Sequence, residues 1–382
     1  MNRYAYLDHN AKTELRPEAL EAVTAALGLN GNPSSVHGPG RGARKILEGA
    51  RAQVAALVGA IPSDVIFTSG GTEANNLALR GTGRQRHLVS AVEHPSVLNC
   101  GGDIIPVDGD GIVDLASLEN MLAADDRPAL VSVMLANNET GVIQPVAQVA
   151  EIAHRHGALV HCDAIQGAGK IAIDMGGLGI DLLSLSGHKI GAPLGVGALI
   201  VAGLDARHDL GLKASGFGGR HERGFRAGTE NLSGIAGFGA AAGCIQSMID
   251  DMPRIGALRD RLEAAVRAIE PRSVIFGEHV DRLANTSFLT MPGTDSSTQL
   301  MAFDLAGVGV STGSACSSGK VTNSAVLATM GVDADIAGAA VRVSLGWSTD
   351  KQDIDAFVAA WADLHAQGNK MSKTLVSEKS AA

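Results

Sequence analysis

Short apolar runs that alternate with helix-forming segments constrain the fold of this chain most strongly. Strands buried on both faces read as nearly continuous apolar runs, and parallel strands need helical crossovers between them. The alternation therefore predicts an α/β fold with a mostly parallel sheet that is covered by helices on both faces. The runs predicted as strands are 65–67, 87–89, 104–107, 130–133, 158–160 and 182–184.

The pattern changes after about Pro253, which predicts a second and smaller α+β domain. Helical spacing over 258–269 precedes a strand at 286–289, and a strand at 341–345 precedes a final helical pattern. We therefore expect a large domain over residues 14–252. Residues 1–13 and 253–369 would form the small domain, and the polar segment 370–382 would be a flexible tail.

Composition excludes several classes of function. The net charge of -9 and the aromatic content of 3% argue against nucleic acid as a partner. The 4 cysteines lack the paired spacing of a disulfide framework or a metal site. No apolar stretch reaches the roughly 20 residues that span a bilayer. We expect a soluble cytoplasmic protein with no metal and no membrane contact.

A glycine turn at Gly70-Gly71 separates a predicted strand from a predicted helix that begins at Thr72. The first backbone N–H groups of a helix have no intrahelical partner, so they can bind a phosphate group. An ordinary helix cap with a glycine turn explains the same residues. The loop lacks the motifs of ATP and dinucleotide binding, which disfavours both ligands.

Asp163 and Gln166 follow the predicted strand at 158–160. The carboxyl end of a central strand is where α/β sheets bind ligands. A carboxylate there could keep a pyridine nitrogen protonated, and Gln166 could donate to a ring oxygen. The alternative is an Asp that caps the next helix.

Lys189 lies in a Ser-Gly-His-Lys segment after the strand at 182–184, and several glycines follow it. A lysine in such a close-fitting loop can bond covalently to an aldehyde when its amine is neutral. Ser186 and His188 flank it and could bind a phosphate group. The alternative is a solvated loop lysine.

Three further residues carry candidate chemistry. Cys316 lies in a run of small residues with no apolar pattern, where an exposed thiol is either a chemical liability or a reactive group with a function. His94 follows the strand at 87–89, and its imidazole could stack on a flat cofactor and transfer protons; it could equally be an ordinary loop histidine. Arg342 lies inside an apolar strand and needs a carboxylate partner, either from the protein or from a substrate.

Taken together, these segments resemble the pyridoxal-phosphate cysteine desulfurases of the NifS/IscS kind, within the class V aminotransferase-like group. The matching segments run in the family's order over nearly the whole chain. They are residues 6–8, 31–35, 67–73, 93–94, 137–141, 163–166, 186–189, 221–224, 226–229 and 314–316.

The resemblance implies fold type I with a seven-stranded sheet, and it implies a role for each matched residue. Lys189 would hold the cofactor and move the substrate's α-proton, His94 would act as acid and base, and Cys316 would take the sulfur as a persulfide. Arg342 and Asn10 would contact the substrate. The cofactor contacts would come from Gly71, Thr72, Asn138, Asp163, Gln166, Ser186 and His188, with Thr229 reaching the phosphate of a partner subunit.

The resemblance also implies a function: a homodimeric enzyme that removes sulfur from L-cysteine, giving L-alanine, and passes it to an acceptor protein for iron–sulfur cluster assembly or other sulfur transfer. Two features depart from the family. Lys12 stands where Thr or Ser is usual, and the segment beyond Trp361 does not resemble the scaffold-binding end of the housekeeping members. A lyase acting on selenocysteine or another amino acid is one alternative, and a binding protein without activity is another.

Overall fold

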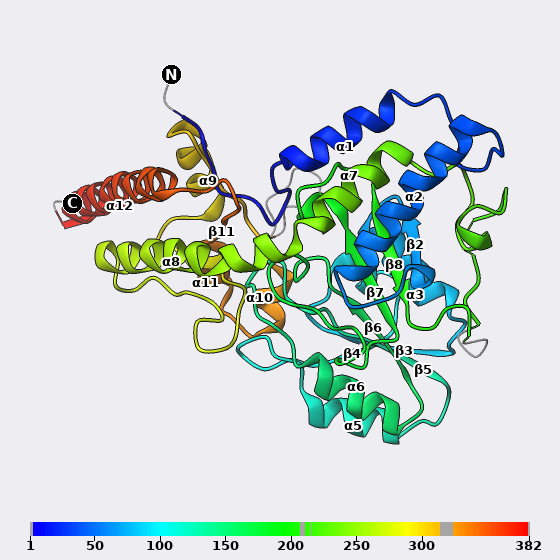
Figure 1. Cartoon of the computed structure of the whole chain (residues 1–382). Helices are drawn as coiled ribbons and strands as arrows, with labels where there is room; N and C mark the ends of the chain where they lie inside the picture. The colour runs from blue at the N-terminus through cyan, green and yellow to red at the C-terminus, as the bar shows by residue number, and fades with distance from the viewer. Residues whose placement is uncertain (1–2, 207–210, 215, 314–323, 381–382) are drawn as a thin grey trace.

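The computed structural model describes residues 3–206, 211–214, 216–313 and 324–380, with side chains up to residue 368. Its main feature is a seven-stranded sheet with the strand order β2-β8-β7-β6-β5-β3-β4 (Figure 1). Neighbouring strands are parallel, except that β8 runs antiparallel to both β2 and β7. The strands are β2 (Val65–Thr68), β3 (Arg86–Ser90), β4 (Asp103–Ile105), β5 (Ala129–Ser132), β6 (Leu159–Asp163), β7 (Leu182–Ser186) and β8 (Gly197–Val201). The predicted α/β architecture is confirmed.

Successive residues of each strand enter different apolar clusters, because side chains alternate between the two faces of a sheet. In β6, for example, Leu159 packs with α3, whereas Val160 packs on the opposite face with α5 and α6. That opposite face is also covered by α2 and α7 at its other end. The helices concerned are α2 (Gly38–Ala56), α3 (Gly71–Gly81), α5 (Leu115–Ala123), α6 (Val146–Arg155) and α7 (Leu232–Gly243), and α1 (Pro17–Leu27) packs on α7.

Two small sheets lie beside the large one, on the side of the molecule where both termini lie (Figure 1). In one, β1 (Ala5–Tyr6) pairs in parallel with β10 (Val308–Gly309), and in the other β9 (Thr286–Thr290) pairs antiparallel with β11 (Ala340–Ser344). The helices here are α8 (Ile245–Ile269), α9 (Ser296–Leu305), α10 (Ala325–Thr329), α11 (Ala334–Gly338) and α12 (Lys351–Ser380). A separate apolar cluster joins Leu7 of the N-terminal segment to residues of α8, α9 and α12.

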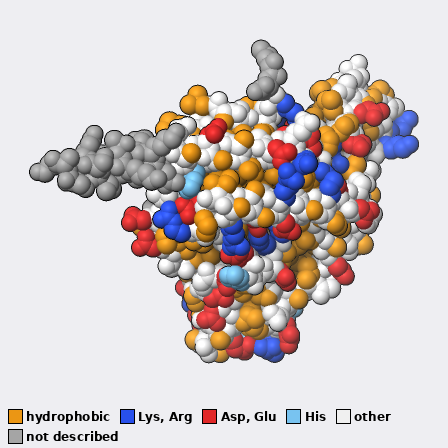
Figure 2. Space-filling view, turned by 90° about the vertical axis from the view of Figure 1, so that its left-hand side faces the viewer, with side chains coloured by type: hydrophobic (Ala, Val, Ile, Leu, Met, Phe, Trp, Pro, Cys, Tyr) orange, Lys and Arg blue, Asp and Glu red, His pale blue; other side chains and the backbone are white. Residues whose placement is uncertain are grey.

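The aromatic side chains of Phe303, Phe357 and Trp361 stack at the centre of this second cluster and are fully buried. Acidic and basic side chains are mixed over the face seen in Figure 2. Exposed ion pairs on α8, such as Arg261 with Asp355 of α12, each contribute little stability. The packed aromatic residues therefore matter more for holding this part of the molecule together than the surface charges do.

Within the described part of the chain, no helix taken singly has both the length and the apolar composition to cross a bilayer; only α7 and α8 together, bent by 60° at their junction, reach that threshold.

Candidate active site

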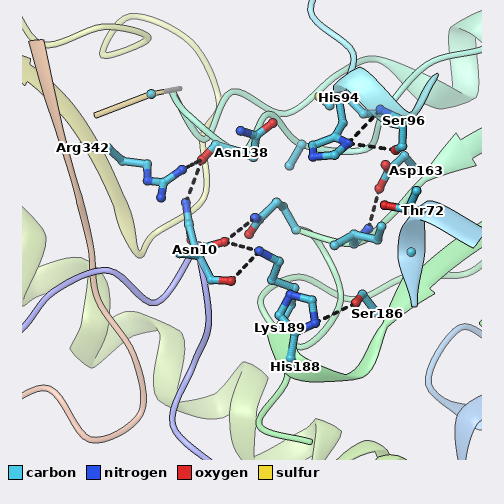
Figure 3. Close-up of a pocket in the computed structure, with 17 residues that line it drawn as sticks. Asn10, Thr72, His94, Ser96, Asn138, Asp163, Ser186, His188, Lys189 and Arg342 are labelled. Carbon is cyan, nitrogen blue, oxygen red and sulfur yellow. Dashed lines mark hydrogen bonds between the residues drawn. The ribbon is translucent and has the colours of Figure 1, made fainter. Parts of the chain in front are cut away.

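A cavity of about 330 Å³ lies at the carboxyl edge of the seven-stranded sheet. Residues at the ends of β6 and β7 and at the start of α3 form one side of it (Figure 3). The other side carries Arg342 of β11 and Asn10, which follows β1. Open α/β sheets bind ligands at this edge, so the fold itself marks the cavity as the candidate site.

Most of the predicted site residues line this one cavity. They are Asn10, Gly71, Thr72, His94, Asn138, Asp163, Gln166, Ser186, His188, Lys189 and Arg342. Thr229 does not line it, and lies exposed in the loop between η4 (Glu222–Gly224) and α7. Cys316 lies outside the described residues, but Gly313, three positions before it, lines the cavity.

Lys189 ends a short 3₁₀ turn, η2 (Gly187–Lys189), that follows β7 directly. Its Nζ donates hydrogen bonds to the carbonyl oxygens of Asn10 at 2.5 Å and Ala11 at 2.8 Å. These bonds hold the amine at the wall of the cavity, against the segment that follows β1 (Figure 3).

Asp163 is the last residue of β6 and is buried. Asn75 Nδ2 donates to its Oδ2 at 2.7 Å, and the Ile165 backbone N–H donates to its Oδ1 at 3.0 Å. Burial raises the pKa of Asp163, and these two donors together with the nearby His94 only partly offset the effect. A cationic N–H group in the cavity would favour the ionised carboxylate.

His94 caps the short helix α4 (Pro95–Leu98), and its Nδ1 accepts a hydrogen bond from the Ser96 backbone N–H at 3.1 Å. Ser96 Oγ lies 2.8 Å from the same nitrogen and accepts a hydrogen bond from Asn75 Nδ2 at 2.9 Å. The hydroxyl hydrogen of Ser96 therefore points to Nδ1, and a neutral His94 ring carries its proton on Nε2. Through Asn75 and Ser96, a chain of hydrogen bonds links Asp163 to His94.

The N-terminus of α3 opens onto the cavity at Gly71 and Thr72. The side chain of the preceding residue cannot cap this helix, because that residue is Gly70. A Cβ atom at Gly71 would lie 2.1 Å from Ile165 Cδ1, so a larger residue would displace Ile165. The sequence thus leaves backbone N–H groups available for an anion at this end of the cavity.

Ser186 and His188 face this corner from the end of β7, with Ser186 Oγ and His188 Nδ1 3.0 Å apart. Burial, followed by the charges of Lys189 and Lys12, lowers the pKa of His188 to about 4. His188 is therefore neutral near pH 7, and with Ser186 it offers uncharged hydrogen-bond partners beside the helix N-terminus.

Arg342 is buried, and its two terminal nitrogens are paired by the protein. Nη2 donates to Asp8 Oδ1 at 2.7 Å, and Nη1 donates to the Asn138 carbonyl at 3.0 Å. The sequence left open whether the carboxylate partner is structural or a substrate. The structure supplies a structural partner, Asp8, and also places Arg342 at the cavity wall.

Pyridoxal phosphate, which the resemblance implies, fits the chemistry of these residues. The buried carboxylate of Asp163 complements a protonated ring nitrogen, and the start of α3 with Ser186 and His188 complements a phosphate. The amine of Lys189 lines the same cavity and suits an aldehyde. The donor set of the cavity therefore matches each polar end of this cofactor.

Sequence reasoning missed several residues of the site. Ser96 and Asn75 connect Asp163 to His94, and Lys170 donates to both Asn10 and Gln166. Glu93 is buried behind the site, and burial together with the charge of Asp163 raises its pKa well above its usual value. Ser96 could have been found, since it stands two residues after His94 at a helix start; the others need the tertiary fold.

Comparisons with known proteins agree with this geometry. The model of the aminotransferase class-V family matches residues 5–357. A cysteine desulfurase of Cereibacter sphaeroides is 43% identical over 92% of this chain and 92% of its own. The solved structure of a NifS-like protein from Rickettsia africae is 35% identical with a TM-score of 0.88, over 95% of this chain and 100% of its own. That of SspA in complex with cysteine is 29% identical with a TM-score of 0.75, over 90% of this chain and 99% of its own. The predicted resemblance is confirmed, and the chain belongs to the aminotransferase class-V family.

Proposed function

We propose that this protein is a pyridoxal-phosphate-dependent cysteine desulfurase. One observation carries the proposal: a single cavity collects Lys189, Asp163, His94 and Arg342 from four separate segments of the chain. The 43% identity to a curated cysteine desulfurase over 92% of the chain supports the same activity. A binding protein without activity has no physical need for these four groups in one cavity.

When bound, pyridoxal phosphate supplies an electron sink conjugated to the substrate's α-carbon. Asp163 would keep the proton on the ring nitrogen, and Gln166 would donate to the ring oxygen. Gly71, Thr72, Ser186 and His188 would bind the phosphate group, and Asn138 would help to position the ring. The presence of all these residues in the lining of one cavity supports these roles.

Lys189 would hold the cofactor in the resting protein and then carry the α-proton of the substrate. Arg342 would bind the substrate's carboxylate, with Asn10 beside it, since both line the side of the cavity opposite the sheet edge. His94 would stack on the ring and move a proton at Nε2, because its Nδ1 is held as an acceptor by Ser96.

Cys316 would complete the reaction. Its thiolate attacks the sulfur of L-cysteine, so that an S–S bond forms while the Cβ–S bond breaks and its electron pair stays with the carbon. That carbon then takes a proton, and the products are L-alanine and a persulfide on Cys316. No external oxidant or reductant is needed. The position of Gly313 at the cavity wall, three residues earlier, supports this role.

We further propose a cytoplasmic homodimer that passes the persulfide sulfur to an acceptor protein, for iron–sulfur cluster assembly or other sulfur transfer. Thr229 is exposed and does not line the cavity of its own chain, as expected of a residue that reaches a second copy. The chain would divide into a large unit of residues 14–252 and a small one of residues 1–13 and 253–369. The apolar cluster that joins Leu7 to α8 and α12 supports this division.

The test is to supply L-cysteine to the purified protein with bound cofactor and to measure alanine and sulfide. Equal yields of both products are expected with a reductant present. Cys316→Ala should keep the cofactor's visible absorbance and lose sulfide production. Sulfide release by Cys316→Ala at the wild-type rate would refute the assigned nucleophile. Parallel assays with selenocysteine and cysteine sulfinate would separate the desulfurase from a related lyase, and a protein without visible absorbance would refute cofactor binding.

A further inference from the structure

A second lysine lies behind the candidate site and makes two hydrogen bonds to residues that line it. Lys170 Nζ donates to Gln166 Oε1 at 2.8 Å and to Asn10 Oδ1 at 3.0 Å. Lys170 does not line the main cavity; it lines a cavity of about 40 Å³ on the other side of Lys189. Burial, followed by the charges of Lys189 and Arg342, lowers the pKa of Lys170 well below its usual value.

The two bonds of Gln166 fix which way its side-chain amide faces. Its Nε2 donates to the Asn10 carbonyl at 2.9 Å, while its Oε1 accepts from Lys170. A backbone carbonyl is only an acceptor, and a lysine amine with these partners acts as a donor. Turning the amide over would place its oxygen against the Asn10 carbonyl oxygen and would lose the bond that Lys170 donates to Oε1, so the two partners favour the observed orientation.

Hydrogen bonds also hold the side chain of Asn10 in one orientation. Its Oδ1 also accepts from Asn285 Nδ2 at 3.0 Å, and its own Nδ2 donates to Thr286 Oγ1 at 2.9 Å. Its backbone N–H donates to Ser344 Oγ at 2.9 Å. Lys170 therefore holds Gln166 against a buried anchor that is itself tied to β9 and β11.

We propose that Lys170 is a positioning residue that makes Gln166 present an N–H group, rather than its carbonyl oxygen, to the ring oxygen of pyridoxal phosphate. Gln166 lines the cavity, and one of its two Nε2 hydrogens has a partner among the described residues, the Asn10 carbonyl. The second hydrogen serves the ring oxygen. Without Lys170, one of the two bonds that hold this orientation is lost, so the amide more often turns its carbonyl oxygen toward the anionic ring oxygen. This inference rests on the proposed function.

Lys170→Met tests it, because methionine keeps most of the side chain's length and removes the donor. We expect pyridoxal phosphate, titrated into the protein stripped of cofactor, to bind about tenfold more weakly, as for the loss of one hydrogen bond to a charged group. The visible absorption maximum of the bound cofactor should also shift. Lys351→Met, at an exposed lysine on α12, is the matched control and should change neither.

A double-mutant cycle with Gln166→Leu separates positioning from a merely structural effect. If Lys170 acts through Gln166, Lys170→Met should weaken cofactor binding by less than about twofold when Gln166 is already Leu. An undiminished effect in that background would overturn the inference. The inference would also be overturned if Lys170→Met bound the cofactor as tightly as the wild-type protein does, provided that the wild-type protein binds it normally.

Lys170→Arg guards against a folding failure of the methionine variant. Arginine keeps N–H donors at this position, so cofactor binding should stay closer to wild type than in Lys170→Met. If Lys170→Met and Lys170→Arg lost cofactor affinity equally, with unchanged thermal unfolding, the proposed role of the Lys170 N–H donor would be overturned. A wild-type protein that binds no pyridoxal phosphate would overturn the proposed function and this inference together.

Discussion

Arg342 donates a hydrogen bond of 2.7 Å to Asp8, and this pair joins β11 to the segment that follows β1. The Arg342 side chain is 3% exposed and that of Asp8 is 20% exposed. Arg342 therefore lines the cavity with one of its terminal nitrogens already bonded to the carboxylate of Asp8. The hydrogen bond to Asp8 fixes the orientation of the guanidinium group that a substrate carboxylate would approach.

Asp8→Asn should therefore impair substrate binding more than turnover. We expect the KM for L-cysteine to rise about tenfold while kcat changes by less than about threefold, because Arg342 loses its orienting charge. The free energy of unfolding should fall by about 1–3 kcal/mol, less than for a fully buried pair, because Asp8 is partly exposed. Steady-state kinetics and urea unfolding measure both. Asp260→Asn, which breaks the exposed pair with Arg259, is the control, and an unchanged KM would contradict the role of Asp8.

Ser96→Ala should lower kcat while leaving the cofactor bound. The variant removes the hydroxyl that connects Asn75 to His94 Nδ1, so His94 loses part of what fixes its ring and its tautomer. We expect about a tenfold loss of kcat, a changed pH profile and unchanged visible absorbance. Ser96→Thr should restore much of the rate, since threonine keeps the hydroxyl.

Ser132→Ala provides the matched control for this prediction. Ser132 Oγ bonds to Nδ1 of His161, a buried histidine that does not line the cavity. That variant also loses a buried serine–histidine bond, so it should lose stability but keep its pH profile. The same change of pH profile in both variants would show that the effect of Ser96 is not specific to His94.

The sequence predicted the sheet edge and its residues well, because short-range signals mark them. Asp163 directly follows one apolar strand, and the segment that ends at Lys189 directly follows another. Both patterns can be recognised in the sequence without knowledge of the tertiary fold. β8 (Gly197–Val201) was not among the predicted strands, because the glycines and proline before it indicate a loop. Helix α8 continues through Pro253, where the sequence pattern had suggested a change of domain.

Residues that act through tertiary contacts could not be predicted from the sequence. Most strands of the large sheet lie between Asn10 and Lys170 in the sequence. Only the fold brings the side chains of these two residues within 3.0 Å of each other. The same holds for Asn75, which reaches Asp163 from α3. The domain division and the roles of the individual site residues stay predictions, and Cys316 lies outside the described residues.

Lys189→Ala should abolish the visible absorbance that pyridoxal phosphate gains when it bonds to a lysine. The amine of Lys189 lines the cavity, whereas Lys170 lies behind it. The spectrum of the purified variant, with its cofactor content measured after denaturation, checks this. Persistence of the wild-type band would assign the covalent bond to another lysine, and Lys170 would be the first to replace.

Glu222 lies in a segment that matches the family, and the structure gives it a part in a buried ion pair. Arg51 donates to its two carboxylate oxygens at 2.8 and 2.7 Å, and the Phe67 backbone N–H donates to it at 2.8 Å. Both side chains are buried. Breaking this pair leaves buried Arg51 with only the half-exposed Glu48 as a carboxylate partner, and a buried charge that has lost its main partner costs more than the pair itself contributes.

Glu222→Gln should therefore lower the free energy of unfolding by about 3–5 kcal/mol, because Arg51 stays charged and buried. Adding Arg51→Met removes that charge. The double variant should therefore have a higher free energy of unfolding than Glu222→Gln alone, although it carries one more substitution. Urea unfolding of the three proteins measures the difference. Asp355→Asn, at the exposed pair with Arg261, should change stability by less than about 0.5 kcal/mol. A double variant that is less stable than Glu222→Gln would show that the buried charge of Arg51 is not what destabilises the single variant.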